Sequence, residues 1–236
     1  MKLLRYVANL GYGTRREVTR LLADGRVTRR DGTILDALTE AVHEEVLIDG
    51  EPLDPPPNAM LLLHKPVGYV CSSTGLEPLV YDLLPSRFLR RSPLMAAVGR
   101  LDRGTSGLLL FTDDGRLNHR VTSPRTHLPK IYDASLANDL RGDEVERFGD
   151  GTLMLAGETH ALAPASLEVR GPRHVRVTLS EGRYHQVRRM FAALGNHVVS
   201  LHRIAIGGLS LGPLPEAHWR VLAPAEISAI WSPPIP

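Results

Sequence analysis

Apolar residues recur with two different periods along this chain, and the change of period separates a short helical part from a longer part rich in strands. "KLLRYVANLG" (2–11) has apolar residues at helical spacing and ends on a glycine, which favours a short helix. "TRRE" (14–17) is a capping box for a second helix, which we expect to end near Gly25. "RVT" (26–28) and "EVLIDG" (45–50) then predict short strands.

After residue 59 the pattern is that of strands, interrupted by one clear helix. "YHQVRRMFAALG" (184–195) has apolar residues at positions i, i+3, i+4 and i+7 and stops at a glycine. This order predicts an α+β fold with a mostly antiparallel sheet, and the proline-rich tail 231–236 is expected to be irregular. Apolar runs bounded by Gly, Pro or Asp predict strands at 60–72, 106–115, 130–137, 165–171, 174–182 and 197–212.

A proline-rich segment marks the boundary between the two parts. Pro55, Pro56 and Pro57 are consecutive and cannot continue a helix or a central strand. We therefore predict a linker within 52–59. It separates two domains, at 1–56 and 60–236, with few contacts between them.

Composition narrows the class of protein and its compartment. An apolar content of 43% suffices for real hydrophobic cores, and no apolar run approaches the roughly 18 residues of a membrane span. The first residues lack the apolar region and cleavage site of a signal peptide. The single cysteine, Cys71, fits a reducing cytoplasm and is expected to pack as a small apolar side chain. We expect a cytoplasmic monomer.

Charge is distributed unevenly. Residues 1–30 carry eight Lys or Arg and two acids, whereas residues 31–58 carry eight acids and no Lys or Arg. Of the 28 basic residues, 25 are arginine, the side chain best suited to forked contacts with phosphate. Three arginines lie on the polar side of the second predicted helix: Arg15, Arg16 and Arg20. We expect them to bind a nucleic-acid backbone rather than to face solvent alone.

This N-terminal part resembles an S4 domain, a small RNA-binding fold. The resemblance covers about 1–56 and rests on the "TRRE" helix start, "ADGRVTRRDG" (23–32) and the strand that ends at Gly50. The family usually has Ser where Thr14 stands and often has Asn where Asp31 stands. The change to Asp31 leaves the predicted fold intact but leaves open which part of the RNA this turn contacts.

Asp102 is a carboxylate that follows a short apolar segment and lies between Arg100 and Arg103. A carboxylate at the start of a buried strand needs cations nearby to remain ionised. In an extended segment Arg100 and Asp102 project to the same side. The residue types alone are equally consistent with a catalytic aspartate for a polyanionic substrate and with a structural Asp–Arg pair at a turn.

"GRLDRGTSGLLLFTDDG" (99–115) resembles the signature of the pseudouridine synthases, and the similarity extends to "KIY" (130–132) and to 181–211. With the S4-like part it covers nearly the whole chain. "EGRYHQVRRMFAALGNHVV" (181–199) is more similar to the small-subunit group than to its large-subunit relatives. The resemblance implies isomerisation of a uridine in small-subunit (16S) ribosomal RNA, with large-subunit (23S) rRNA as the alternative substrate.

The resemblance implies a role for four residues of the chain. Asp102 corresponds to the family's catalytic aspartate, and Arg100 to the arginine that takes the space of the displaced nucleotide. Tyr132 corresponds to the tyrosine that stacks on the target uracil, and Arg183 to the basic residue that forms an ion pair with the aspartate. Asp133 stands where relatives often carry an apolar residue, and strand alternation turns it away from the site.

The segment that contains the predicted helix 184–195 supplies three further candidates. Arg188 lies on the flank of the predicted helix 184–195 and is expected to contact RNA. His185 and Gln186 either brace the turn at Arg183 or touch RNA, and bracing is favoured.

Such residues suit the chemistry that the resemblance implies. The N1–C1′ bond of uridine breaks, the uracil turns, and C5 joins the same carbon. In folded RNA the nucleotide must first leave its stack, at a cost of roughly a few kcal/mol, and an aromatic face then holds it, an interaction of about 1–3 kcal/mol. The carboxylate acts as nucleophile or as base, and neither a metal nor an organic cofactor is implied.

Other residues have simpler interpretations, and two other functions stay open. Asp113 and Asp114 in "TDDG" indicate a turn rather than a metal site, and the ten histidines show no zinc-ligand spacing with cysteine. A glycosidase would use Asp102 with Glu181 as its second acid. A non-catalytic rRNA-binding or assembly factor would use Asp102 as a structural residue.

Overall fold

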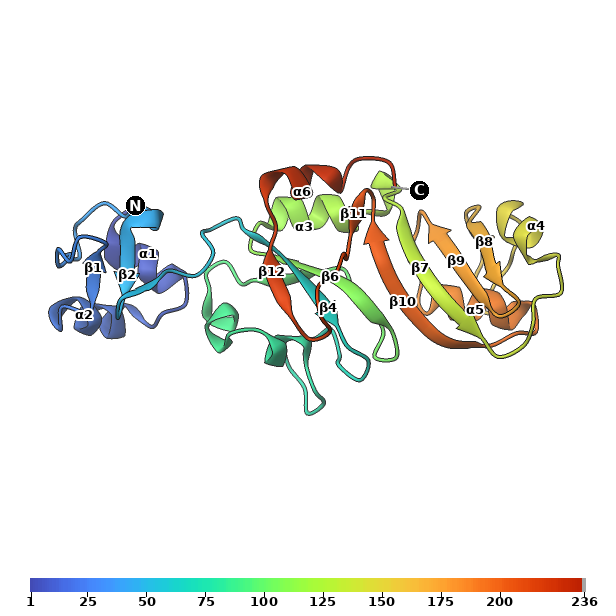
Figure 1. Ribbon diagram of the computed structural model, residues 1–236, viewed down its shortest axis with the longest axis horizontal. Helices are drawn as coiled ribbons and strands as arrows, with labels where there is room; N and C mark the ends of the chain where they lie inside the picture. The colour runs from blue at the N-terminus through green and yellow to red at the C-terminus, as the bar shows by residue number, and fades with distance from the viewer. Residues whose placement is uncertain (235–236) are drawn as a thin grey trace.

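The computed structural model describes residues 1–234 and shows an elongated molecule built from two parts (Figure 1). The second part is built around a nine-stranded sheet, so the predicted α+β class is confirmed. The N-terminal part contains helices α1 (Leu3–Asn9) and α2 (Arg15–Ala23) and a three-stranded sheet of β1 (Val27–Arg29), β2 (Val46–Ile48) and β3 (Glu51–Pro52).

The N-terminal part has its own hydrophobic core and begins its second helix as the sequence predicts. The Thr14 hydroxyl accepts the Glu17 N–H at 3.3 Å, and the Glu17 carboxylate accepts the Thr14 N–H at 2.6 Å. The apolar sides of both helices pack on the small sheet in a core that includes Leu3, Val7 and Val18, each fully buried. Local sequence pattern is sufficient for the start of α2, because its capping box lies within one turn.

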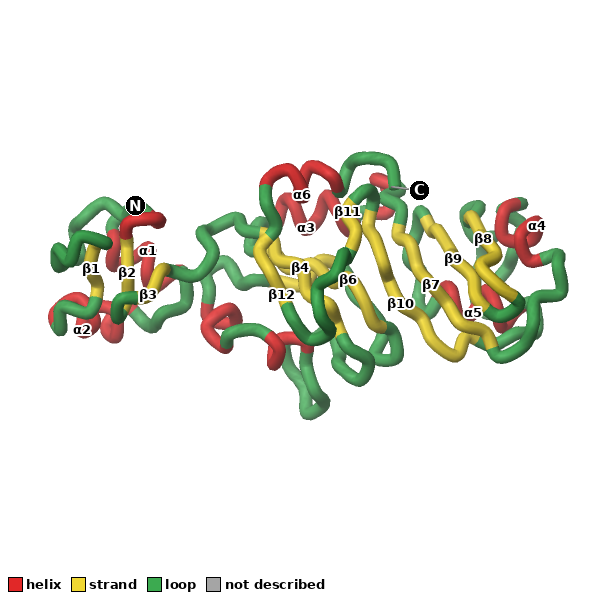
Figure 2. Tube along the Cα trace, in the orientation of Figure 1, coloured by secondary structure: helices red, strands yellow, loops and turns green. Residues whose placement is uncertain are grey.

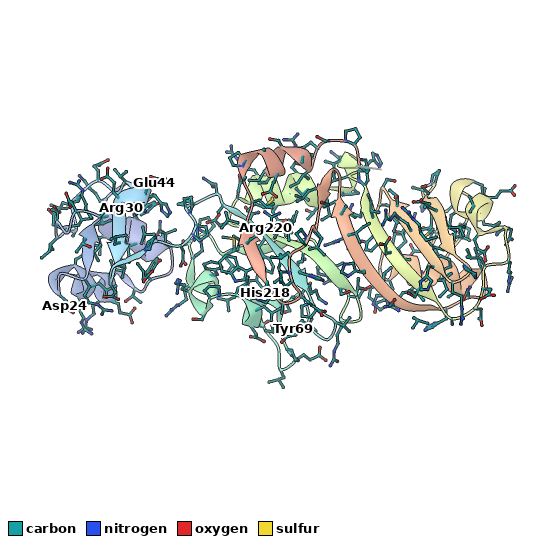
Figure 3. All side chains as sticks on the ribbon, viewed as in Figure 1. Asp24, Arg30, Glu44, Tyr69, His218 and Arg220 are labelled. Carbon is teal, nitrogen blue, oxygen red and sulfur yellow. The ribbon has the colours of Figure 1, made fainter. Side chains whose placement is uncertain are left out.

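The acidic segment 31–58 folds back over the basic residues near β1. Arg26 forms an ion pair with Asp49 at 2.6 Å, and the Arg30 side chain donates to the Glu44 carbonyl at 2.9 Å, two residues that Figure 3 shows close together. This neutralises part of the basic N-terminal stretch. The helix α2 arginines are exposed, and none of them forms an ion pair within the described part of the chain; they are Arg15, Arg16 and Arg20.

The large sheet has the strand order β12-β4-β6-β10-β7-β9-β8. Neighbouring strands are antiparallel except β6 and β10, which are parallel and joined by two residue pairs, His202 with Ser106 and Arg203 with Gly107. The sheet therefore consists of two halves that meet at a short junction. Its strands are β4 (Met60–Lys65), β5 (Ala96–Val98), β6 (Ser106–Thr112), β7 (Lys130–Leu136), β8 (Ser166–Gly171), β9 (His174–Leu179), β10 (Val198–Ile206), β11 (Leu209–Ser210) and β12 (Trp219–Val221).

Strands β4 and β6 are buried on both faces, which explains their continuous apolar runs. On one face, Leu62 and Leu110 belong to a core that includes side chains of α3 (Gly115–Thr122) and α6 (Pro224–Ala229). On the other face, Leu61 and Leu109 pack against the long connection between β4 and β5, which Figure 2 shows as loops with short helical turns. Helices α4 (Glu144–Gly149) and α5 (Gln186–Ala193) contribute to the core of the β7–β10 half.

The linker itself is held against the large part by a buried arginine, a contact that the sequence did not indicate. Arg91 is buried and forms an ion pair with Asp113, with Nη2 2.6 Å from Oδ2. Its Nη1 and Nη2 also donate to the carbonyls of Pro55 and Pro56 at 2.8 and 3.1 Å. Prolines offer carbonyls but no N–H donors, and a buried arginine satisfies them here.

The "TDDG" segment is not a simple turn either. Asp114 is the N-cap of α3, and its carboxylate accepts the N–H groups of Arg116 and Leu117 at 2.8 and 3.1 Å. An Asp-Gly pair satisfies the rules for a turn and for a helix start equally well, and only the following apolar side chains decide between them. Asp113 forms the buried ion pair with Arg91 described above.

Within residues 1–234, no helix has both the length and the apolar character to cross a bilayer. Residues 231–234 of the proline-rich tail contain no helix or strand, as predicted, and Ile235 and Pro236 lie outside the described residues.

Candidate active site

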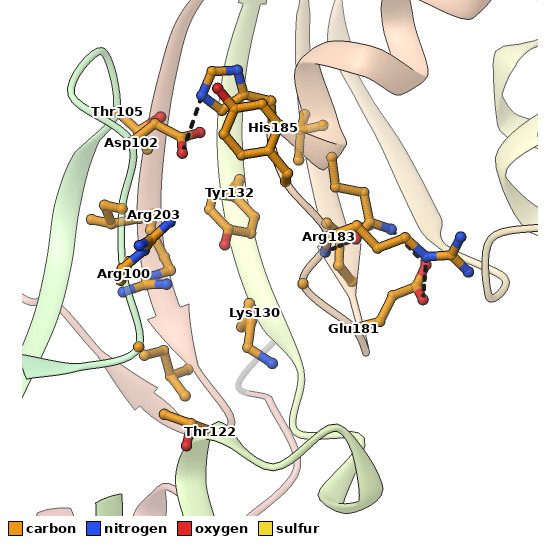
Figure 4. Close-up of a pocket in the computed structure, with 18 of the residues that line it drawn as sticks. Arg100, Asp102, Thr105, Thr122, Lys130, Tyr132, Glu181, Arg183, His185 and Arg203 are labelled. Atoms are coloured by element: carbon orange, nitrogen blue, oxygen red, sulfur yellow. Dashed lines mark hydrogen bonds and ion pairs between the residues drawn. The ribbon is translucent and has the colours of Figure 1, made fainter. Parts of the chain in front are cut away.

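A pocket opens near the junction of the two half-sheets, between the turn that precedes β6 and the start of α5 (Figure 4). It brings together all four residues that the resemblance marks, which come from distant segments of the chain. Its lining includes Arg100, Asp102, Lys130, Tyr132, Arg183, His185 and Arg203.

Asp102 lies in a tight turn that a buried lysine holds in place. The Thr105 N–H donates to the Asp102 carbonyl at 3.0 Å. Lys65, at the end of β4, is fully buried, and its ammonium group donates to the carbonyls of Pro66, Asp102 and Thr105 at 2.9, 3.2 and 2.7 Å. Burial lowers the pKa of Lys65. Sequence reasoning missed this residue, although a lysine at the end of an apolar strand is a signal that could have found it.

The turn is also held from the loop that follows β4. The Leu101 N–H donates to the Cys71 sulfur at 3.4 Å, and Cys71 packs against the apolar cluster beside β4 and β6. Burial raises the pKa of the Cys71 thiol. Cys71 is therefore the small packing residue that its sequence context predicts, and it helps to position the residue next to Asp102.

The carboxylate of Asp102 faces His185 rather than an arginine. His185 Nε2 lies 3.4 Å from Asp102 Oδ1, and the two side chains are 38% and 34% exposed. His185 precedes α5 with a left-handed backbone, φ 50°, a conformation that costs a non-glycine residue about 1–3 kcal/mol and is retained mostly at functional sites. Its ring stacks on that of Tyr184, with centroids 3.9 Å apart.

The expected ion pair between Arg183 and Asp102 is not formed in the structure. Arg183 instead pairs with Glu181 at 3.2 Å and with Glu158 at 3.3 Å, and Nη2 donates to a backbone carbonyl. These two carboxylates hold the guanidinium group away from Asp102, as Figure 4 shows for Glu181. Glu158 is 25 residues earlier in the chain, so sequence spacing gave no sign of this competition.

Gln186 braces the turn at Arg183, as predicted, and occupies Glu181 in doing so. The Gln186 side chain accepts the Arg183 N–H at 2.8 Å and donates to Glu181 at 2.7 Å. Glu181 also accepts the Ala163 N–H at 3.2 Å and pairs with Arg183. Both oxygens of Glu181 are therefore engaged, which argues against its use as the second acid of a glycosidase.

Arg188 donates hydrogen bonds within the protein, and the RNA contact predicted for it stays a prediction. Nη1 donates to the Val198 carbonyl and Nη2 to the Gly104 carbonyl, both at 2.8 Å. The side chain thus links α5 to β10 and to the turn that carries Asp102. A helix flank that appears solvent-facing in the sequence lies against another part of the fold.

Arg100 and Tyr132 both line the pocket. Arg100 is exposed at its edge, and Tyr132 is half-buried in β7. Asp133, the next residue, points away from the pocket and pairs with Arg176 on β9 at 2.8 Å. The departure at Asp133 thus leaves the pocket unchanged, as strand alternation predicts.

Comparison with known proteins identifies the family. The family model described as RNA pseudouridylate synthase matches residues 59–193. The chain is 40% identical to ribosomal small subunit pseudouridine synthase A of Escherichia coli K12, over 98% of this chain and 100% of that protein. It is 37% identical to the protein of the same name from Vibrio cholerae, over the same shares of the two chains. A crystal structure of a pseudouridylate synthase is 35% identical, covers 98% of this chain and 99% of its own, and superposes with a TM-score of 0.69.

The sheet, the pocket and these similarities define an RNA-modifying isomerase. The chain belongs to the RNA pseudouridylate synthase family. The family predicted from the motifs is therefore confirmed, and the roles of individual residues stay predictions.

We predict that His185→Ala lowers the single-turnover rate of pseudouridine formation about tenfold, because the His185 ring lies 3.4 Å from the Asp102 carboxylate and the loss of about 1.4 kcal/mol of transition-state stabilisation is a factor of ten in rate. RNA affinity, measured by filter binding, should change little. His185→Asn retains a donor and tolerates the left-handed backbone, so it should recover part of the rate. Full activity of the alanine variant would show that His185 does not orient Asp102.

Proposed function

We propose that this protein isomerises a specific uridine of small-subunit (16S) ribosomal RNA to pseudouridine. The observation that carries the proposal is the similarity over nearly the full length to relatives named for the small ribosomal subunit. The pocket that contains Asp102 and Tyr132 supports it. We further propose that the protein works in the cytoplasm as a monomer.

In the proposed reaction the target nucleotide leaves its stack and enters the pocket. Arg100, exposed at the edge, takes the space that the nucleotide vacates, and Tyr132 stacks on the uracil. Asp102 acts on the reacting nucleotide as nucleophile or as base. Its backbone is fixed by Lys65, so its carboxylate needs little reorganisation when RNA arrives.

The N-terminal part is proposed to bind rRNA as an S4-like module. Its separate core and its two helices on a small sheet support this assignment. The exposed arginines of α2 are free to contact phosphates, since the nearby acidic segment pairs with other basic residues. Phosphate contacts position the RNA, and the pocket selects the base.

The proposal is tested by incubating the protein separately with small-subunit and large-subunit rRNA, as transcripts and as ribosomal particles, and mapping pseudouridine in each. We expect one new pseudouridine, confined to small-subunit rRNA. Modification of large-subunit rRNA alone would favour the 23S alternative. Absence of product with every substrate would contradict the enzymatic proposal and favour a binding factor.

Replacing Arg15, Arg16 and Arg20 together by alanine should weaken rRNA binding and make the slope of log affinity against log salt shallower, by about 0.7–0.9 for each phosphate that the variant no longer neutralises. The rate at saturating RNA should persist, because these residues belong to the N-terminal part. The matched control replaces three exposed arginines at the far end of the sheet: Arg147, Arg170 and Arg173. Equal losses of affinity in both triple variants would mean that general charge, not the face of α2, binds RNA.

A further inference from the structure

Arg203 is a buried arginine in the pocket, and no group within residues 1–234 neutralises its charge. It lies on β10, lines the pocket, and is 3% exposed. Nε donates to the Leu108 carbonyl at 2.8 Å, whereas Nη2 is buried without any hydrogen-bond partner. Within residues 1–234 no carboxylate forms an ion pair with it. An unpaired buried charge destabilises a fold, so this arrangement calls for a ligand.

The surroundings of Arg203 are positively charged as well. Lys130 and Arg100 line the same pocket, and Figure 4 shows Arg100 beside Arg203 and Lys130 on the neighbouring strand, below Tyr132. Burial, and then the charge of Arg203, lowers the pKa of Lys130. Asp102 is the nearby carboxylate of the pocket, and it faces His185. Repulsion among these cations would be relieved by a ligand that carries, or develops, negative charge.

The position of Arg203 selects the base rather than the RNA backbone as its partner. In the antiparallel pairing of β10 with β7, Arg203 stands directly opposite Tyr132, the proposed stacking residue. A β-bulge follows between Arg203 and Ala205, and such bulges re-aim side chains beside active sites. A phosphate would stay with the RNA chain outside, whereas a base stacked on Tyr132 would bring its edge toward the guanidinium group of Arg203.

We propose that Arg203 donates hydrogen bonds to a carbonyl oxygen of the flipped uracil and stabilises the negative charge that develops on it. This inference rests on the proposed function. When the N1–C1′ bond breaks, its electron pair passes to the uracil and spreads over N1 and the carbonyl oxygens. C5 then bonds to C1′ and loses its proton while N1 gains one, so that the reaction is balanced as an isomerisation. Preorganised donors at such oxygens are a major source of catalysis.

The test measures single-turnover rates on an rRNA fragment that contains the mapped uridine. Arg203→Met removes the charge but keeps the length of the side chain. We expect the rate at saturating RNA to fall about 10²-fold, the affinity for RNA to change little, and the melting temperature not to fall. Arg203→Lys, which keeps one charged donor, should have an intermediate rate. Arg176→Met, on the opposite face of the sheet, is the matched control and should have the parent's rate.

Thio-substituted fragments identify the partner of Arg203. Sulfur accepts hydrogen bonds weakly, so 2-thio or 4-thio substitution of the target uridine should slow the parent enzyme yet scarcely slow Arg203→Met further. Equal thio effects in both proteins, or a loss of affinity without a loss of rate, would overturn the proposal, the latter in favour of a phosphate contact. If Arg203→Met melts at a lower temperature than the parent, the thio effects can still be compared, because each effect is a ratio of rates within one protein. A parent enzyme that forms no product overturns the proposed function itself.

Discussion

Asp102→Asn is expected to abolish pseudouridine formation while leaving rRNA binding intact. Asparagine has nearly the shape of aspartate but cannot act as an anionic nucleophile or base, so the single-turnover rate should fall at least roughly 10³-fold. The fold should persist, because Lys65 and Thr105 hold the turn through the backbone carbonyl of Asp102 and not through its carboxylate. Nucleoside analysis of treated rRNA and a filter-binding assay measure the two quantities separately.

The control for this variant is Asp133→Asn, the same chemical change at a residue on the opposite face of β7. Asp133 pairs with Arg176 outside the pocket, so its replacement should affect stability slightly and the rate little. Pseudouridine formation by purified Asp102→Asn, free of any contaminating enzyme, would contradict the catalytic assignment. Loss of RNA binding in that variant would instead indicate that the carboxylate has a structural role.

Local signals in the sequence predicted the capped helix α2, the helix α5 and even the short strands β1 and β2, but they missed three helices after residue 59: α3, α4 and α6. The capping box at Thr14 and the apolar run that forms β6 act within a few residues, and both are found as predicted. Helices α4 and α6 have six residues each, which is too short for a helical period to stand out. Their stability comes from packing on the sheet, and that packing depends on strands far away in sequence.

The candidate site could be predicted from the sequence only in part, because some of its contacts join residues far apart in the chain. The motifs placed Asp102, Arg100 and Tyr132 in one pocket, and the structure agrees. The partner of Arg183 could not be read, since Glu158 approaches it from a separate loop. Arg203 did leave a signal, because it shares its strand parity with Leu201 and Ala205, which are both buried. A charged residue at a core position of a strand indicates a paired charge or a site.

The linker shows how composition alone can mislead about domain contacts. Three prolines indicate a break in regular structure, and such a break does occur after β3. Yet the carbonyls of Pro55 and Pro56 are acceptors for buried Arg91. Removing residues 1–56 would therefore leave Arg91 with fewer partners in the large part. The linker is therefore bound to the large part through its backbone carbonyls, which its composition does not show.

Tyr132→Ala is expected to lower the rate of pseudouridine formation about 10- to 100-fold, whereas Tyr132→Phe should retain most of it. An aromatic face contributes about 1–3 kcal/mol to holding an unstacked base, and phenylalanine preserves that face. Tyr132 also packs against apolar clusters of both half-sheets, so the alanine variant should melt at a lower temperature.

Measuring the rate at a temperature where each variant is fully folded separates stacking from stability. Because Tyr132 stands opposite Arg203 across the β7–β10 pair, loss of its ring should also weaken the contact between Arg203 and the uracil. The effects of Tyr132→Ala and Arg203→Met should therefore combine less than additively in the double variant. If phenylalanine is as damaging as alanine, the hydroxyl group takes part in the chemistry and stacking alone does not explain the residue.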